Sequence, residues 1–232
     1  MRSGRNYAHV AAARLGARLT DLTVSGATTA NVLDTSQRVL LRKFEPQIEG
    51  VPADVDLVTV TAGGNDLGYI KAALFSCAAG TLGTATRGKI HPAPEIPEPT
   101  SANVDTATQG LLRIVDAISR RCLRARVVLV DYLPIFSDTT LPQIDVPLDA
   151  TQIAALRALH DAVTQASARA AQTSGATLVQ ASTLGQGHEL GSAAPWIHSF
   201  RLLGPTKFGS SLHPNAQGMR AIGEHVAETA RG

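Results

Sequence analysis

Apolar residues gather in four short runs, each followed by turn residues and then by a helical pattern. The runs are residues 18–24 (RLTDLTV), 55–62 (VDLVTVTA), 125–132 (ARVVLVDY) and 176–181 (ATLVQA). Short runs rich in Val, Leu and Ile are typical of parallel strands that are buried on both faces. Because helical patterns alternate with these runs, the sequence predicts an α/β domain built on a parallel sheet.

Four segments have the apolar spacing of helices. They are residues 6–15, 104–121 with Ser101 as N-cap, 151–173 with Asp149 as N-cap, and 216–230. Two long stretches, 77–100 and 133–148, show no regular pattern, and irregular segments of that length in a compact domain are often functional. The chain has no internal repeat and no linker, so we expect a single domain over residues 1–232.

Composition narrows the classes of function. The chain has 232 residues with 21 basic and 19 acidic side chains, and a net charge of +2 gives no field that would favour nucleic acid. No apolar stretch approaches the roughly 20 residues that cross a bilayer, and the N-terminus does not resemble a signal peptide. Cys77 and Cys122 are too few for a metal cluster; we expect free thiols, with one disulfide as the alternative. We expect neither metal nor cofactor.

Three turns carry residues that are suited to chemistry. Gly26 follows the first run, Gly63-Gly64-Asn65 follows the second, and His213 comes just before the last helix. In an open parallel sheet, ligands bind beyond the carboxyl ends of the strands, which is where the first two turns are expected. The three turns are therefore the candidate parts of a site.

Each turn also has a purely structural interpretation. The turn at Gly26 can be a tight connection with an N-cap at Thr28 or Thr29, and Asn65 and Asp66 can cap the following helix. In the functional interpretation, the Asn65 amide donates hydrogen bonds to negative charge that develops on an oxygen. Pro214 holds the preceding His213 in an extended conformation at a helix entrance, where an imidazole can act as a general base.

The order of these motifs resembles the SGNH hydrolases, also called GDSL esterases and lipases. The similarity is greatest to the actinobacterial secreted lipases, in which RSxxNY, SGATT, GGND, VVLVxYxPI and HPNAxG occur in this order, and it covers residues 2–222. The resemblance implies a flavodoxin-like three-layer α/β/α sandwich that hydrolyses carboxylic esters. It also implies a small-molecule or lipid ester as the substrate, and we expect a monomer.

The resemblance assigns roles to individual residues. It implies that His213 is the general base, and that Gly26, through its backbone N–H, and Asn65 are the oxyanion donors. Where many relatives carry an aspartate that orients the histidine, this chain has Ser210, whose main-chain carbonyl can do the same. Around these residues, three others are expected to contact substrate: Gly64, Trp196 and His188. His198 flanks Trp196 as well and can line the same pocket.

One part of the family pattern is missing. The family's nucleophile is the serine of a GDS motif at the end of the first, central strand, and no GDS occurs in these 232 residues. Ser3 and Ser25 do not follow a strand in the required way. We therefore expect weak or no ester hydrolysis and a sheet without its first strand. A start site assigned too late, a catalytically dead remnant and different chemistry are the competing explanations.

Two further expectations concern function class and location. A non-catalytic protein that binds an acyl or carbohydrate ligand in the same pocket is the alternative function. Val24 stands where the secreted relatives have a cysteine, so most of their disulfide framework is gone and a reducing compartment becomes more plausible. We expect a cytoplasmic location for the chain as given, and secretion if a longer N-terminus exists.

Overall fold

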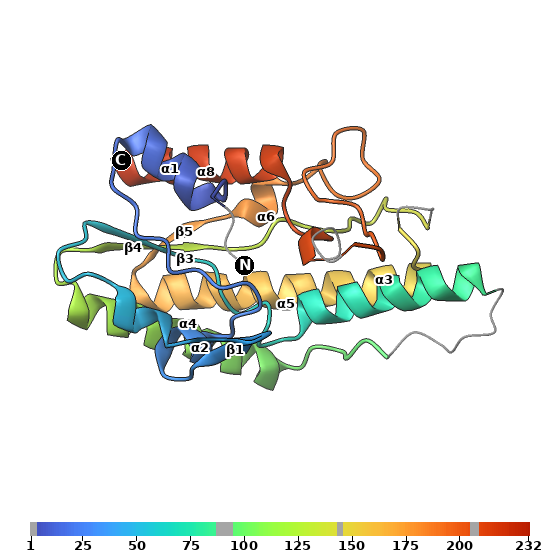
Figure 1. Ribbon diagram of the computed structural model, residues 1–232, viewed down its shortest axis with the longest axis horizontal. Helices are drawn as coiled ribbons and strands as arrows, with labels where there is room; N and C mark the ends of the chain where they lie inside the picture. Colours follow the sequence, from blue (N-terminus) through green and yellow to red (C-terminus); the bar gives the residue numbers. More distant parts are fainter. Residues whose placement is uncertain (1–3, 87–94, 143–145, 205–208) are drawn as a thin grey trace.

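A parallel three-stranded sheet forms the centre of the molecule. The computed structural model describes residues 4–86, 95–142, 146–204 and 209–232. Strands β3 (Leu57–Val60), β4 (Arg126–Val130) and β5 (Thr177–Val179) lie in the order β3-β4-β5, with Leu129 of β4 opposite both Val60 and Leu178. The predicted α/β class with a parallel sheet is confirmed (Figure 1).

Helices cover both faces of this sheet. Helices α1 (Tyr7–Leu15) and α8 (Ala216–Arg231) lie together on one face, and α4 (Ser101–Arg121) and α5 (Ala150–Ser174) lie on the other (Figure 1). The short helix α2 (Thr29–Leu33) packs on α4 and on η1 (Gln47–Gly50), the short helix α6 (Ala181–Leu184) packs on α8, and α3 (Tyr69–Ala85) packs beside α5. This arrangement is the three-layer sandwich that the family resemblance implies.

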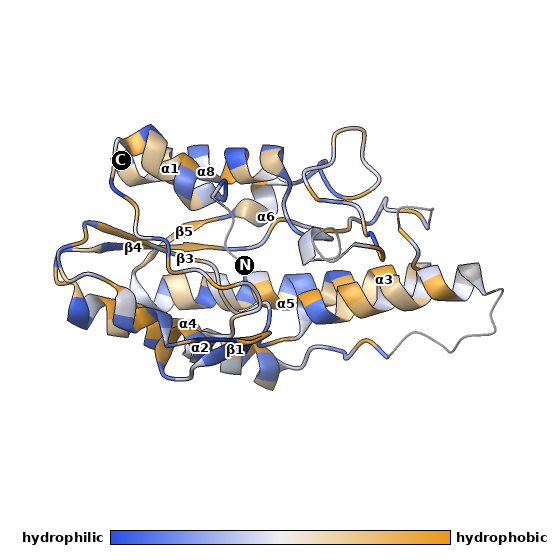
Figure 2. Cartoon of the chain, viewed as in Figure 1, coloured by the Kyte–Doolittle hydropathy of each residue, from blue (hydrophilic) through white to orange (hydrophobic). Residues whose placement is uncertain are grey.

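Alternation along β4 explains the two halves of the core. Val128 and Val130 belong to a large apolar cluster that includes residues of α1 and α8 and extends to α5, whereas Val127 and Leu129 belong to a second cluster with residues of α4 and the end of α5. Four consecutive apolar residues, Val127 to Val130, are the expected result of burial on both faces. Figure 2 shows the strands of the sheet mainly in the colours of hydrophobic residues.

Helix ends follow local capping chemistry. Asp149 caps α5, as predicted, because its carboxylate accepts a hydrogen bond from the backbone N–H of Gln152 at 2.8 Å. The predicted N-cap of α4 is wrong by one residue. Thr100, not Ser101, caps this helix in a reciprocal pair with Asn103, whose side-chain oxygen accepts from the Thr100 backbone N–H at 3.0 Å.

Two predicted elements are corrected by the structure. Residues 18–24 do not form a strand, because the Asp21 carboxylate binds the Thr23 backbone N–H at 2.9 Å and the Asn6 side chain at 3.0 Å, which ties the segment to the start of α1. The first part of the predicted irregular stretch 77–100 is helical and belongs to α3, since its Ala and Leu residues favour a helix despite Gly80 and Gly83.

Other expectations are met or remain open. In the described part of 133–148 the chain forms no helix and no strand of more than one residue, as predicted. Residues 87–94 and 143–145 lie outside the described residues. Cys77 and Cys122 are free and buried, and burial raises the pKa of the Cys77 thiol to about 12. The missing first strand stays a prediction, although β3 is an edge of the sheet within the described ranges.

The chain also contains a small hairpin that the sequence did not predict. Strands β1 (Gln37–Val39) and β2 (Arg42–Phe44) pair antiparallel, with a two-residue turn between Val39 and Arg42. None of the helices in the described residues is long and apolar enough to cross a membrane.

Candidate active site

The turn after β3 is held in place by Tyr132, which follows β4. Gly63 has φ +103°, a conformation that favours glycine, and the backbone N–H of Gly64 donates to the Tyr132 hydroxyl at 3.2 Å. A Cβ atom at Gly64 would lie 2.8 Å from Cζ of Tyr132, so only glycine fits between the turn and the ring. Burial raises the pKa of Tyr132, which keeps the hydroxyl protonated. Sequence reasoning missed Tyr132; its place directly after a buried strand was the available signal.

Asn65 and Asp66 join this turn to the turn at Gly26. The Asn65 side-chain nitrogen donates to the carbonyl oxygen of Ala27 at 2.9 Å, and the Asp66 carboxylate accepts from the Thr29 backbone N–H at 3.0 Å and from its hydroxyl at 2.6 Å. Both side chains thus reach back to the first turn and the start of α2. The alternative in which they cap the next helix, α3, is wrong.

The turn at Gly26 has the N-cap that its structural interpretation expected. Thr28 caps α2 in a reciprocal pair with Asn31, and Gly26 adopts φ +81°. Residues 18–24, directly before this turn, form no strand. The bonds from Asn65 and Asp66 nevertheless bring Gly26 and Asn65 into one locally connected unit, which is the arrangement that two oxyanion donors require.

The imidazole of His213 is fixed by the carbonyl of Ser211. Its Nδ1 lies 2.8 Å from the Ser211 oxygen, whereas the Ser210 oxygen accepts from the His213 backbone N–H at 3.2 Å. The predicted orienting carbonyl is therefore one residue off. Leu212, between them, has φ +61°, and this uncommon backbone conformation turns the chain sharply so that Ser211 faces the ring.

The contact with Ser211 also decides which ring nitrogen carries the hydrogen. A carbonyl oxygen can only accept, so Nδ1 of neutral His213 must be the donor. The lone pair is then on Nε2. A histidine in this tautomer can accept a proton through Nε2 while the carbonyl holds the ring in position.

A neighbouring segment braces the His213 loop. The backbone of His198 exchanges hydrogen bonds with this loop, from its N–H to the His213 carbonyl at 2.9 Å and from the Leu212 N–H to its carbonyl at 3.0 Å. The Asn215 side chain caps α8 by accepting from two backbone N–H groups. In Figure 1, α8 begins on the side of the sheet where the parallel strands end, so the loop before α8 and the turn after β3 lie toward the same edge of the sheet.

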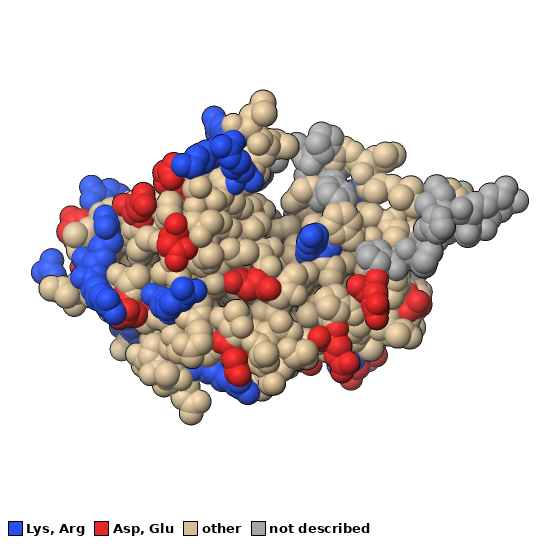
Figure 3. All heavy atoms as spheres, turned by 90° about the horizontal axis from the view of Figure 1, so that it is seen from below, with Lys and Arg blue, Asp and Glu red and all other residues tan. Residues whose placement is uncertain are grey.

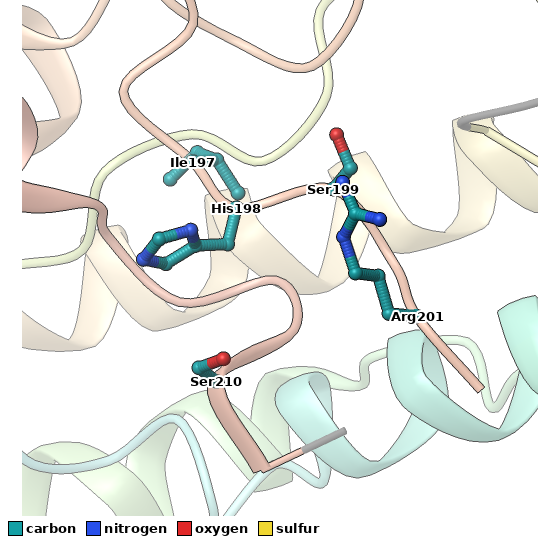
Figure 4. A pocket seen from close by; sticks show the side chains of 5 residues that line it. All are labelled: Ile197, His198, Ser199, Arg201 and Ser210. Atoms are coloured by element: carbon teal, nitrogen blue, oxygen red, sulfur yellow. The ribbon is translucent and has the colours of Figure 1, made fainter. Parts of the chain in front are cut away.

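A hollow of about 540 Å³ opens beside this loop. It is lined by Ile197, His198, Ser199, Arg201 and Ser210, which Figure 4 shows with the His198 ring and the Arg201 side chain on opposite sides. Burial, and then the nearby His213 and Arg201, hold the pKa of His198 below its ordinary value. His198 is therefore mainly neutral at pH 7 and leaves Arg201 as the fixed positive charge of the hollow.

The two aromatic residues predicted to contact substrate are packed on each other. The rings of His188 and Trp196 stack with centroids 3.8 Å apart, and the backbone N–H of Asn215 donates to the Trp196 carbonyl at 2.7 Å. Trp196 thereby supports the start of α8. His198, not His188, lines the hollow beside His213, and contact of Trp196 and His188 with a substrate stays a prediction.

Comparison with known proteins identifies the family of this chain. The sequence profile of the GDSL-like lipase/acylhydrolase family matches residues 1–221. Lipase 2 of Streptomyces coelicolor is 35% identical over 98% of this chain and 76% of its own length, and a lipase of Streptomyces rimosus is 31% identical over 94% and 72%. The crystal structure of the extracellular lipase from S. rimosus superposes with a TM-score of 0.70 at 28% identity, covering 99% of this chain and 88% of that one.

The chain therefore belongs to the GDSL-like lipase/acylhydrolase family, the SGNH hydrolases. The structure of phospholipase A1 from Streptomyces albidoflavus, 20% identical with a TM-score of 0.72 over 98% of this chain and 87% of that one, shares the fold.

Proposed function

We propose that this chain supplies the general base and the oxyanion donors of a serine-type carboxylic ester hydrolase. The observation that carries the proposal is the His213 imidazole, whose Nδ1 is fixed 2.8 Å from the Ser211 carbonyl at the entrance of α8. With its lone pair on Nε2, the ring takes a proton from the attacking group and returns it to the leaving alcohol.

The oxyanion donors are the second amide hydrogen of Asn65 and the backbone N–H of Gly26. One hydrogen of the Asn65 amide is used by the Ala27 carbonyl, which leaves the other for an ester oxygen as it becomes negative. Within the described part of the chain, the Gly26 N–H has no hydrogen-bond acceptor. Donors held in place before the reaction stabilise the tetrahedral intermediate without reorganisation.

We further propose that ester hydrolysis by these 232 residues is impaired because none of their serines acts as the nucleophile. The sequence has no GDS motif, which carries the nucleophile in the family. Water must then replace the serine. Sites that keep only binding and oxyanion donors retain about 10³-fold acceleration over water.

The relatives support a lipid ester as the substrate, since both Streptomyces proteins are named lipases. The S. rimosus structure is of an extracellular lipase, which favours secretion over the cytoplasmic location predicted from the sequence. The alternative function, binding of an acyl or carbohydrate ligand without turnover, is favoured by the same lack of a GDS serine in these 232 residues.

Hydrolysis of p-nitrophenyl butyrate separates the two functions. The impaired hydrolase is expected to show turnover of about 10³-fold or less above the uncatalysed rate. Asn65→Ala should lower this rate through loss of an oxyanion donor, and His213→Ala should lower it through loss of the base that activates the attacking water. His225→Ala, a half-exposed histidine of α8, is the matched control that keeps this turnover. A rate equal to buffer in the unaltered chain, together with binding of butyrate, supports the non-catalytic alternative.

A further inference from the structure

Two leucines stand fully in solvent at the tip of the β1–β2 hairpin, residues 37–44. Leu40 is 95% exposed and Leu41 is 100% exposed. Single exposed leucines are common on protein surfaces. Two adjacent leucines at the tip of a hairpin form a small exposed apolar surface that no neighbouring side chain covers. In Figure 1 the hairpin lies on the lower side of the molecule, away from the central sheet.

The backbone of this turn is unfavourable for leucine. Leu40 has φ +55° and occupies the first central position of a two-residue hairpin turn, where glycine is preferred when φ is positive. A β-turn of this kind would be more stable with glycine or asparagine at this place. Stability of the free chain therefore does not account for a leucine there, and a residue held against its preference points to a role in binding.

Positive charge surrounds the apolar tip. Arg38 and Lys43 lie directly opposite each other in the ladder, which is an unfavourable pairing of like charges, and Arg42 adjoins the leucines. Lys43 binds Glu45 at 2.8 Å, whereas the side chains of Arg38 and Arg42 have no acidic partner in the described ranges. Figure 3 shows the lower side, where most of the visible Lys and Arg lie toward one end and Asp and Glu predominate toward the other.

The hairpin is connected to the candidate active site by a direct bond. The side-chain nitrogen of Gln37 donates to the carbonyl of Ser25 at 3.0 Å, one residue before the proposed oxyanion donor Gly26. The same nitrogen is the atom that a Cβ at Gly26 would meet, at 3.6 Å. A surface that receives the hairpin tip would thus be positioned next to this turn.

We propose that the β1–β2 hairpin docks the protein on an anionic lipid surface. Leu40 and Leu41 enter the boundary between headgroups and acyl chains, while the guanidinium groups of Arg38 and Arg42 bind lipid phosphates. A protein partner fits less well, since a stable interface buries roughly 800 Å² on each side and a convex tip of two side chains offers far less. Contact with anionic lipid would also relieve the repulsion between Arg38 and Lys43.

Vesicle binding of the full chain tests this proposal and needs no catalytic turnover. Co-sedimentation is measured with vesicles of phosphatidylcholine, with and without phosphatidylglycerol. We expect binding that requires phosphatidylglycerol and falls about 100-fold or more in the double variant Leu40→Asn, Leu41→Asn. Asparagine tolerates positive φ, so the turn is kept. The variant Arg38→Gln, Arg42→Gln should also lose about tenfold.

Leu123→Asn is the matched control, because Leu123 is 88% exposed in the turn between α4 and β4 and has a basic neighbour, Arg124. It should bind vesicles like the unaltered chain. Absence of binding to anionic vesicles, an equal loss in Leu123→Asn, or a change of oligomeric state in the hairpin variants instead of a loss of lipid binding would each overturn the proposal. Because the readout is binding, these outcomes are independent of whether the chain hydrolyses esters.

Discussion

Replacing Gly110 by alanine is expected to lower the free energy of unfolding by about 2 kcal/mol. A Cβ atom at this position in α4 would lie 2.3 Å from Oγ1 of Thr29, far inside van der Waals contact. Thr29 cannot turn aside, because its hydroxyl is bound to the Asp66 carboxylate at 2.6 Å and its backbone N–H is bound to the same group. The new methyl group must therefore push α2 away from α4.

The consequence extends to the candidate site, because α2 carries the turn at Gly26. Urea unfolding followed by circular dichroism measures the loss of stability. Gly83→Ala in α3 is the matched control, since a Cβ there meets no atom within 4 Å and alanine favours a helix by up to about 1 kcal/mol. If Gly110→Ala proved as stable as the unaltered chain, the close packing of α2 on α4 would be contradicted.

Binding of a reaction product is expected to depend strongly on Asn65. A carboxylate such as butyrate resembles the hydrolysis product and places a negative oxygen where the Asn65 amide and the Gly26 N–H converge in the proposed site. Asn65→Ala should weaken this binding by about tenfold or more, because a hydrogen bond to a charged oxygen contributes about 1.5 to 3 kcal/mol. Isothermal titration calorimetry measures the affinity.

Butanol, which has the same chain length but no charge, is the ligand control. Its affinity should not change in Asn65→Ala, and thermal unfolding of the variant shows whether loss of the bond to the Ala27 carbonyl disturbs the fold. Equal weakening of butyrate and butanol would mean that Asn65 shapes the pocket without acting as an oxyanion donor.

Much of the fold could be predicted from periodicity because local and tertiary preferences agree there. The run at 125–132 has four consecutive apolar residues, Val127 to Val130, which are buried in β4, and Asp149 caps α5 by local hydrogen bonds alone. Residues 18–24 largely alternate apolar and polar residues as a strand can, but the side chain of Asp21 binds Asn6, the N-cap of α1, and the adjacent backbone. Such a contact over 15 residues is not visible in a local pattern.

The candidate site could likewise be predicted only in part. Motif order led to Gly26, Asn65 and His213, and the structure adds the contacts that connect or orient them. The carbonyl that orients His213 belongs to Ser211 and not to Ser210 because Leu212 has a positive φ. A leucine in the sequence does not predict this backbone conformation. Tyr132 and Arg201 were missed because their importance arises only from packing against Gly64 and from the hollow beside His213.

Labelling with a fluorophosphonate probe tests most directly the proposal that these 232 residues hold the base and oxyanion donors but no nucleophilic serine. Such probes react with serines that a neighbouring base has activated. We expect no stoichiometric labelling of the chain, as measured by intact mass, and no change in His213→Ala. Stoichiometric labelling at one serine, lost when that serine is replaced, would contradict the proposal and identify the nucleophile within this chain.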